Sequence, residues 1–216
     1  MSHIVIVDYG MGNLRSVAKA LEHVVSSGDH VEISSVPSVI SSADKIVFPG
    51  QGAARDCMRE LSHSKLDDVV LEAAREKPFL GICMGMQVLM AHSQENQGTD
   101  CLGLFPGEVR FFGNELKDKN GVRLKIPHMG WNTVEQCSSH PLWEGIRQYS
   151  RYYFVHSYYV DPRNEDIVAG RSEYGIDFTA AIARDYVFAV QFHPEKSASD
   201  GLRLLRNFSR WDGKIR

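Results

Sequence analysis

No stretch of the sequence approaches the roughly 20 consecutive apolar residues that a membrane-spanning helix needs. The first residues, MSHIVIVDYG, lack the basic start and the long apolar segment of a secretory signal peptide. Positive charge is not in excess either, because the formal net charge is −3, which gives no reason to expect binding to nucleic acid. We therefore expect a cytoplasmic protein with no nucleic-acid or membrane partner.

Zinc and disulfide motifs are also missing. The sequence has no CxxC pair and no HExxH, and its four cysteines are dispersed: Cys57, Cys83, Cys101 and Cys137. A zinc site and a disulfide framework are weakly supported, and in a reducing compartment the cysteines should be free thiols. His128 and His156 have no second ligand at metal-like spacing, so we interpret each as a hydrogen-bonded structural residue.

The segment DYGMGN does not complete a dinucleotide-binding fingerprint. Gly10 and Gly12 follow an apolar run, but Arg15 stands where the third glycine of GxGxxG belongs. No acidic residue ends a clear second strand about 20 residues later. We therefore exclude NAD binding.

The first half of the chain alternates apolar runs with amphipathic stretches. The runs predict strands at 3–7, 45–48 and 78–82. Helical spacing predicts a helix capped by Asn13, a second one within 65–77 and a third over 84–93. Strands alternating with helices at this rhythm predict an α/β fold, with a parallel sheet covered on both faces.

Strand-like segments dominate from about residue 108. They are EVRFF, GWNTV, RYYFVHSYYV, DIVAG and DFTAAIARDYVFAVQF. With turn signals between them, they predict an antiparallel region attached to the parallel core. A last helix containing LRLLRNF follows a possible capping box, Ser197-x-x-Asp200. No linker or repeat divides the chain, so we expect a single domain over residues 1–216.

Cys83 lies between two glycines where a strand should give way to a helix. The segment GICMG is a thiol version of the G-x-S-x-G nucleophile elbow, with Gly81 and Gly85 removing side chains at a sharp turn. The helix N-terminus would favour a thiolate, and the amide of Met84 is placed to stabilise an oxyanion. A buried structural cysteine is the alternative, whereas Cys57, Cys101 and Cys137 have no such context and are most simply packing residues.

A cysteine nucleophile also needs a base, and the segment AVQFHPEKS offers one. His193 ends an apolar run, Pro194 stops its continuation, and Glu195 is placed to orient the imidazole and stabilise its charged form. A histidine at a strand end beside a turn is an equally good interpretation of the spacing alone.

Three motifs together resemble those of the class I glutamine amidotransferases: PGQG at 49–52, GICMGMQ at 81–87 and QFHPEKS at 191–197. Three further segments are similar to the glutaminase subunits of imidazole glycerol phosphate synthases, the enzymes of histidine biosynthesis: VDYGMGNLRSV, IPHMGWN and YYFVHSYY. The resemblance extends from residue 4 to about residue 208.

The resemblance implies roles for individual residues. The catalytic triad would be Cys83, His193 and Glu195. The residues that hold glutamine or its oxyanion would be Gln87, Glu95, Gly50, Gly52, Met84, Ser157 and Tyr158. The partner interface would contain Asn13, Trp131, Tyr153 and Lys196, although from the residues alone a turn, a core aromatic and a solvated charge are the simpler interpretations of the last three. Gln51 departs from many members, which carry valine or another residue there, but the contribution expected at this position is from the main chain.

The implied activity is hydrolysis of L-glutamine through a cysteine thioester, with no metal or organic cofactor. Ammonia would pass to a (β/α)₈ cyclase subunit in a heterodimer, because in water near neutral pH most of it would become unreactive ammonium. Glycines on both sides of Gln51 suggest that a peptide flip gates the oxyanion site.

Three alternatives remain open. A paralogue could supply ammonia to another synthase, and a regulatory subunit could keep the fold without the activity. The third alternative is another protein with a cysteine at the nucleophile elbow, such as a γ-glutamyl hydrolase. Such proteins do not require the segments IPHMGWN and YYFVHSYY together.

Overall fold

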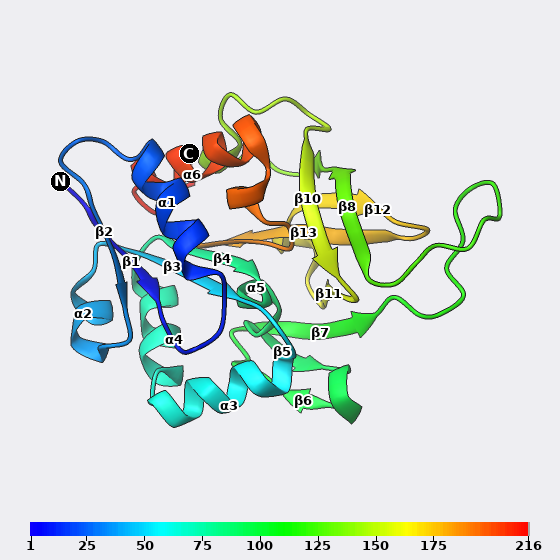
Figure 1. The fold of residues 1–216 in the computed structure, drawn as a ribbon, viewed down its shortest axis with the longest axis horizontal. Helices are drawn as coiled ribbons and strands as arrows, with labels where there is room; N and C mark the ends of the chain where they lie inside the picture. Colours follow the sequence, from blue (N-terminus) through cyan, green and yellow to red (C-terminus); the bar gives the residue numbers. More distant parts are fainter. Residues whose placement is uncertain (216) are drawn as a thin grey trace.

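A twelve-stranded mixed sheet runs through the molecule in the computed structural model, which describes residues 1–215 (Figure 1). Its parallel half has the order β2-β1-β3-β4-β14. The bounds of these strands are β1 His3–Val7, β2 His30–Ser34, β3 Lys45–Gly50, β4 Phe79–Cys83 and β14 Val187–Val190. Because β3 and β4 are parallel neighbours, PGQG and GICMG follow the same edge of the sheet, as ligand sites in α/β folds commonly do.

The sheet continues through mostly antiparallel pairs in the order β14-β13-β11-β7-β5-β6, and β12 and β9 branch from β13. The bounds are β13 Asp177–Arg184, β11 Tyr158–Pro162, β7 Phe105–Phe111, β5 Met90–Ser93, β6 Thr99–Asp100, β12 Val168–Glu173 and β9 Glu135–Gln136. A separate antiparallel pair joins β8 (His128–Thr133) to β10 (Arg151–His156). The predicted combination of a parallel core with an antiparallel second half is therefore confirmed.

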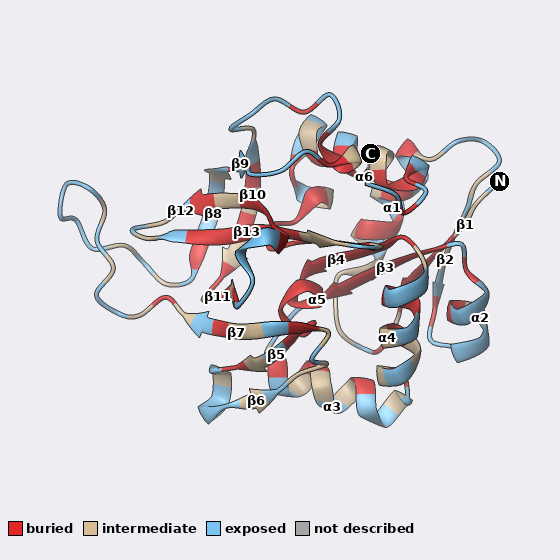
Figure 2. Cartoon of the chain, turned by 180° about the vertical axis from the view of Figure 1, so that it is seen from behind, coloured by how far each residue is buried: buried red, intermediate tan, exposed pale blue. Residues whose placement is uncertain are grey.

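Helices cover both faces of the parallel half. The six α-helices of the described residues are α1 Leu14–Val24, α2 Pro37–Ser42, α3 Ala54–Ser64, α4 Asp67–Glu76, α5 Met84–Gln87 and α6 Ala198–Arg210. Helices α1 and α6 lie on one side of the sheet, and α2, α3 and α4 lie on the other (Figures 1 and 2). Short 3₁₀ turns also occur: η1 Glu95–Gln97, η2 Pro141–Trp143, η3 Glu165–Ile167 and η4 Pro194–Lys196.

Strand β1 shows why the core has two parts. Successive side chains of a strand point to opposite faces. Ile4 and Ile6 accordingly pack with α1 and α6, whereas Val5 and Val7 pack with α2, α3 and α4. All four side chains are fully buried, so the apolar run that predicted a covered strand is explained by burial on both faces.

The predicted helix over 84–93 is wrong beyond its first turn. Helix α5 ends at Gln87, and residues 90–93 form strand β5. The carbonyls of Val88 and Leu89 accept hydrogen bonds from Leu102 and Phe105 instead of continuing the helix. Tertiary pairing therefore overrides the helical spacing of the apolar residues.

Three smaller predictions also need correction. Segment 151–160 is two strands in different sheets, β10 and β11, separated at Ser157. Asn13 and Ser197 do occupy N-cap positions, but neither side chain caps its helix. The Ser197 hydroxyl donates to the carbonyl of His193 and accepts from the amide of Tyr153, so it fixes the turn before α6.

Among residues 1–215, none of the helices has the length and apolar character that a membrane span needs.

The substitution Gly201→Ala tests how α6 is seated against the turn that follows His193. A Cβ on Gly201 would lie 2.0 Å from the carbonyl oxygen of Pro194, closer than two atoms can approach. We expect a loss of about 1–3 kcal/mol in the free energy of unfolding, as for overpacking. The exposed Ser199, in the same helix, is the control, and Ser199→Ala should change stability by less than about 0.5 kcal/mol in urea unfolding. Equal effects of the two substitutions would contradict this packing.

Candidate active site

Cys83 is the last residue of β4 and precedes the single turn of α5. Its backbone angles are φ 56° and ψ −112°, an unfavourable conformation for a residue with a side chain. The positive φ therefore falls on Cys83 itself, and neither Gly81 nor Gly85 shares it. This geometry is that of a nucleophile elbow, in which the strained residue presents its side chain at the tip of a strand-to-helix turn.

The flanking glycines are required by close packing. A Cβ on Gly85 would lie 1.8 Å from the carbonyl oxygen of Phe48 in β3, and one on Gly81 would lie 2.8 Å from the Cβ of Ala189 in β14. Both neighbouring strands thus press against the elbow from either side. Any larger residue would push the elbow away from the sheet, so the two glycines hold Cys83 at its position.

His193 follows β14 and carries the imidazole to the same edge of the sheet. Its Nδ1 lies 2.8 Å from Oε1 of Glu195, and only 9% of the His193 side chain and 1% of the Glu195 side chain are exposed. The other oxygen of Glu195 is buried without a hydrogen-bond partner in residues 1–215, so the pairing with His193 is what offsets the burial of this carboxylate. Nδ1 is thereby occupied, which leaves Nε2 for Cys83.

Cys83 and Glu195 both influence the pKa of His193. Burial lowers the pKa of His193, but the hydrogen bonds and negative charges of Cys83 and Glu195 outweigh it and raise the pKa from its usual 6.5 to about 10. His193 is therefore an imidazolium at neutral pH. A cation beside a sulfur stabilises the thiolate, which is the nucleophilic form of cysteine.

Gln87 and Tyr158 lie together behind the elbow. The side-chain amide of Gln87 donates to the carbonyl of Tyr158 at 3.1 Å and to Oε1 of Gln191 at 2.9 Å. The Glu95 carboxylate accepts from the amide of Ala54 at 2.7 Å, and its charge adds to burial in raising the pKa of Tyr158. Glu95 thus lies near Tyr158 and at the start of α3.

Gly50, Gly52, Met84 and Ser157 offer main-chain groups around this site. Gly50 pairs with Cys83 in register, and a Cβ there would lie 2.8 Å from that of Met84. Gly52 has a positive φ of 89°. Met84 opens α5, where amides have no partner within the helix. Ser157 uses its carbonyl to accept from the amide of Phe112.

Gln191 is a site residue that the sequence motifs did not single out. It is fully buried, and its side-chain amide lies 3.7 Å from Sγ of Cys83 while its oxygen accepts from Gln87. Tyr9 is also buried, and its hydroxyl is so close to Gly50 that a Cβ there would lie 2.5 Å away. A polar residue two positions before His193, within an otherwise apolar run, was the available signal for Gln191.

Trp131, Tyr153 and Lys196 form a surface next to the turn that follows His193. Trp131 and Tyr153 are opposite each other in the β8–β10 pair, with ring centroids 6.3 Å apart, and the Lys196 ammonium lies 5.9 Å from the Tyr153 ring. Trp131 is a strand residue that is 45% exposed, so it is not part of a turn, and Tyr153 is only half-buried. We call these three residues the aromatic surface.

Asn13 and the aromatic surface are joined through the turn after His193. Asn13 precedes α1, and α1 contacts η4, which contains Lys196. The carbonyl of Tyr153 accepts from the amide of His193 at 2.9 Å. The aromatic surface and the backbone of His193 are therefore connected by a direct hydrogen bond.

The sequence predicts structural roles for five further residues: Cys57, Cys101, Cys137, His128 and His156. All four cysteines are free thiols. Cys57 is buried and Cys101 packs against the same core, but Cys137 is exposed, so its interpretation as a packing residue is wrong. His128 and His156 form a buried pair, with Nδ1 of His128 3.0 Å from Nε2 of His156, which confirms that they are hydrogen-bonded residues.

Comparisons with known proteins agree on one family. Residues 5–210 match the family described as glutamine amidotransferase class-I. The chain is 56% identical to the imidazole glycerol phosphate synthase subunit HisH of Pseudomonas putida over 214 residues, covering 99% of this chain and all of that protein. It is 57% identical to the protein of the same name from Thiobacillus denitrificans over 210 residues, covering 97% and 91% of the two chains.

Solved structures of lower identity share the fold. A crystal structure of a glutamine amidotransferase superposes with a TM-score of 0.69 at 19% identity, covering 94% of this chain and 96% of that one. The glutaminase domain of CTPS from Trypanosoma brucei superposes with a TM-score of 0.63 at 17% identity, covering 100% and 97%. The α/β fold expected from the sequence is thereby confirmed.

The protonation of His193 gives a measurable pH dependence. Its pKa of about 10 exceeds the 6.5 of an unperturbed histidine, so the pairing stabilises the folded state fully below pH 6.5 and this stabilisation is lost as the pH rises through 10. We expect an NMR titration of ¹⁵N-labelled histidine to place the midpoint of His193 well above pH 8, and Glu195→Gln to lower it. A midpoint near 6.5 that Glu195→Gln leaves unchanged would contradict the arrangement.

Proposed function

This chain belongs to the class I glutamine amidotransferase family, and we propose that it is the glutaminase subunit of an imidazole glycerol phosphate synthase. In this role it hydrolyses L-glutamine to glutamate and ammonia and supplies the ammonia to a cyclase subunit for histidine biosynthesis. The observation that carries the proposal is the identity of more than half of the residues, over nearly the whole chain, to proteins of that name.

The first half of the reaction forms a thioester at Cys83. The thiolate attacks the side-chain amide carbon of glutamine, and a tetrahedral intermediate with a negatively charged oxygen results. His193 then gives its proton to the departing nitrogen, which leaves as ammonia, and a γ-glutamyl thioester remains on Sγ. Glu195, held 2.8 Å from Nδ1, keeps the imidazole ring oriented so that Nε2 faces the reacting atoms.

The second half releases glutamate. Neutral His193 takes a proton from water, and the resulting hydroxide attacks the thioester carbon. The thiolate of Cys83 leaves, and the imidazolium is restored, so that the next cycle begins from the same charge state. Protein groups supply every proton transfer in this scheme, and no metal or organic cofactor takes part.

Main-chain amides stabilise the oxyanion in this mechanism. The amide of Met84 is in the first turn of α5, and the segment from Gly50 to Gly52 runs alongside it. A flip of one peptide in that segment would aim a second amide at the oxyanion or withdraw it, and the positive φ at Gly52 is of the kind such a flip requires. Gln87, Glu95, Ser157 and Tyr158 hold the amino-acid end of glutamine.

The cyclase docks on the aromatic surface and Asn13. Trp131 is a large exposed aromatic that would be buried as an anchor, and Lys196 would form an ion pair with the partner. The partner is a (β/α)₈ barrel that uses ammonia directly. The hydrogen bond from His193 to the Tyr153 carbonyl gives a route by which docking reaches the catalytic residues.

The second candidate function is that of a paralogue that supplies ammonia to a different synthase. The triad does not distinguish the two functions, because it releases ammonia before the acceptor of that ammonia is involved. The similarity to proteins named as subunits of imidazole glycerol phosphate synthase disfavours it. A silent regulatory subunit is disfavoured because Cys83, His193, Glu195 and Gln87 are all present.

Glutamate release from L-glutamine tests the activity and its partner together. We expect little release by the chain alone and a rise of roughly tenfold or more with the cyclase and its phosphoribulosyl aminoimidazole carboxamide nucleotide. Cys83→Ala should abolish release in every mixture. Activity that ignores the cyclase would indicate a different acceptor, and inactivity in all mixtures would favour the regulatory role.

The substitution Trp131→Ala tests the docking surface. Loss of a buried aromatic anchor should weaken binding to the cyclase by about 2 kcal/mol or more, roughly thirtyfold in Kd, as measured by calorimetry. Val122 is also exposed but lies in the segment between β7 and β8, away from this surface, so Val122→Ala is the control. Equal Kd values for the wild type and Trp131→Ala would contradict the assignment.

A further inference from the structure

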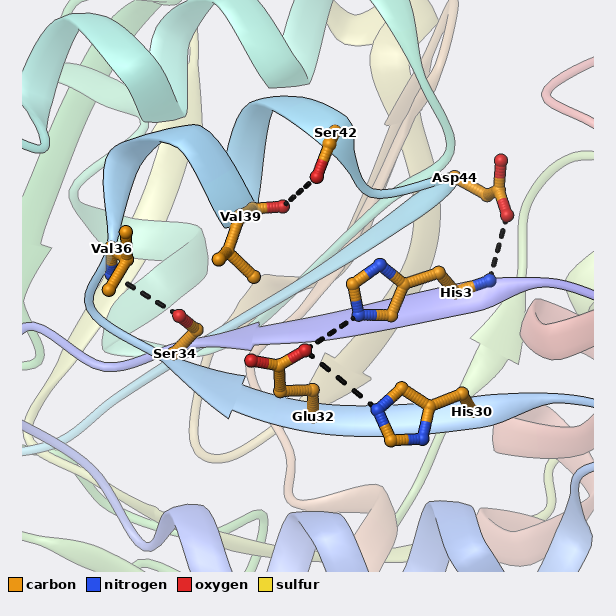
Figure 3. Close-up of polar contacts among 8 residues, drawn as sticks. All are labelled: His3, His30, Glu32, Ser34, Val36, Val39, Ser42 and Asp44. Carbon is orange, nitrogen blue, oxygen red and sulfur yellow. Dashed lines mark hydrogen bonds and ion pairs between the residues drawn. The ribbon is translucent and has the colours of Figure 1, made fainter.

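Two histidines and a glutamate meet at the outer edge of the parallel sheet. His3 opens β1, and His30 and Glu32 lie two residues apart in the edge strand β2 (Figure 3). Nε2 of His3 lies 2.9 Å from Oε2 of Glu32, and Nε2 of His30 lies 3.8 Å from the same oxygen. All three ligand atoms are within 4.8 Å of one another. We call this group the edge cluster.

The register of the strands creates the edge cluster. His3 and His30 are paired in the parallel ladder, so their side chains leave the same face of the sheet, and the two rings stack with centroids 5.3 Å apart. Glu32 lies two residues after His30 and therefore also points to that face. His3 and Glu32, which are 29 positions apart in the sequence, are thus brought together with His30 by backbone pairing alone.

The backbone around the edge cluster is held firmly. The amide of His3 donates to the Asp44 carboxylate at 2.7 Å, and the His3 carbonyl accepts from the amide of Asp44 at 2.9 Å. The amide of His30 donates to the carbonyl of Ser2, whose own amide donates to Asp29. Ligand residues on two fixed strands lose little conformational freedom on binding an ion, which favours affinity.

From this geometry we propose that His3, His30 and Glu32 bind a zinc ion. Zinc takes imidazole nitrogens and carboxylate oxygens at about 2.0–2.2 Å, so two ligands of a tetrahedral site lie roughly 3.3–3.5 Å apart. The observed separations of 2.9 and 3.8 Å bracket that value, and small side-chain rotations reach it. Nitrogen and oxygen donors in this ratio suit zinc better than magnesium or calcium, which prefer oxygen alone.

The site stands apart from the glutaminase centre. His3 is at the beginning of β1, whereas Cys83 is at the end of β4. Because these strands are parallel, the two residues lie at opposite ends of the strands in the sheet. Three protein ligands leave the fourth position to water. The ion would tie the edge strand β2 to β1, and by binding the folded state it raises stability with the logarithm of its concentration above the Kd.

Titration calorimetry with zinc chloride tests the proposal. The titrations use a Cys83→Ala, Cys137→Ser background, so that neither the catalytic thiol nor the exposed one captures the metal. One ion should bind per chain, and His3→Ala, His30→Ala and Glu32→Gln should each weaken binding at least tenfold. The control is His63→Ala, which removes an exposed histidine at the end of α3 and should leave the Kd unchanged.

Thermal unfolding supplies a second readout that separates metal binding from misfolding. Without zinc, His30→Ala should unfold at nearly the wild-type temperature, because His30 is exposed. With zinc, the midpoint should rise for the background protein and for His63→Ala, and remain constant for His30→Ala. Absence of binding below 100 µM zinc, or equal losses in His30→Ala and His63→Ala, would overturn the proposal.

Discussion

The contact between Gly85 and the carbonyl of Phe48 is the constraint on which the rest of the site depends. No side chain fits there, because a Cβ would lie 1.8 Å from that oxygen, and the elbow can therefore lie directly against β3. With β3 on one side and β14 on the other, the turn is fixed, and Cys83 is forced to a φ of 56°. Strain of this kind costs about 1–3 kcal/mol and is sustained only by dense surrounding packing.

The same packing determines where charge can be held. Cys83, His193 and Glu195 follow the ends of adjacent strands β4 and β14, so the register of one parallel pair aligns the thiol with the imidazole. Burial lowers the pKa of His193, but its interactions with Cys83 and Glu195 outweigh burial and raise that pKa. Because the Tyr153 carbonyl accepts a hydrogen bond from the amide of His193, the aromatic surface is directly connected to the candidate active site.

Local patterns in the sequence predicted a great deal of this. Apolar runs located the central strands, and GICMG and QFHPE located Cys83, His193 and Glu195. The patterns failed where tertiary pairing decides, as at 88–93, which is apolar at helical spacing yet joins the sheet. Gln191 and the edge cluster escaped for a related reason, since their partners are distant in sequence and meet only through strand register. Ser197 looked like a helix cap because its second partner, Tyr153, is 44 residues away.

The most direct test of the account is to trap the covalent intermediate. The chain would be mixed with the cyclase, its nucleotide and L-glutamine, quenched in acid during turnover, digested and analysed by mass spectrometry. The account predicts a γ-glutamyl adduct on the peptide that contains Cys83 and unmodified peptides for the other three thiols, Cys57, Cys101 and Cys137. An adduct on another cysteine, or glutamine turnover by a Cys83→Ala chain, would contradict it.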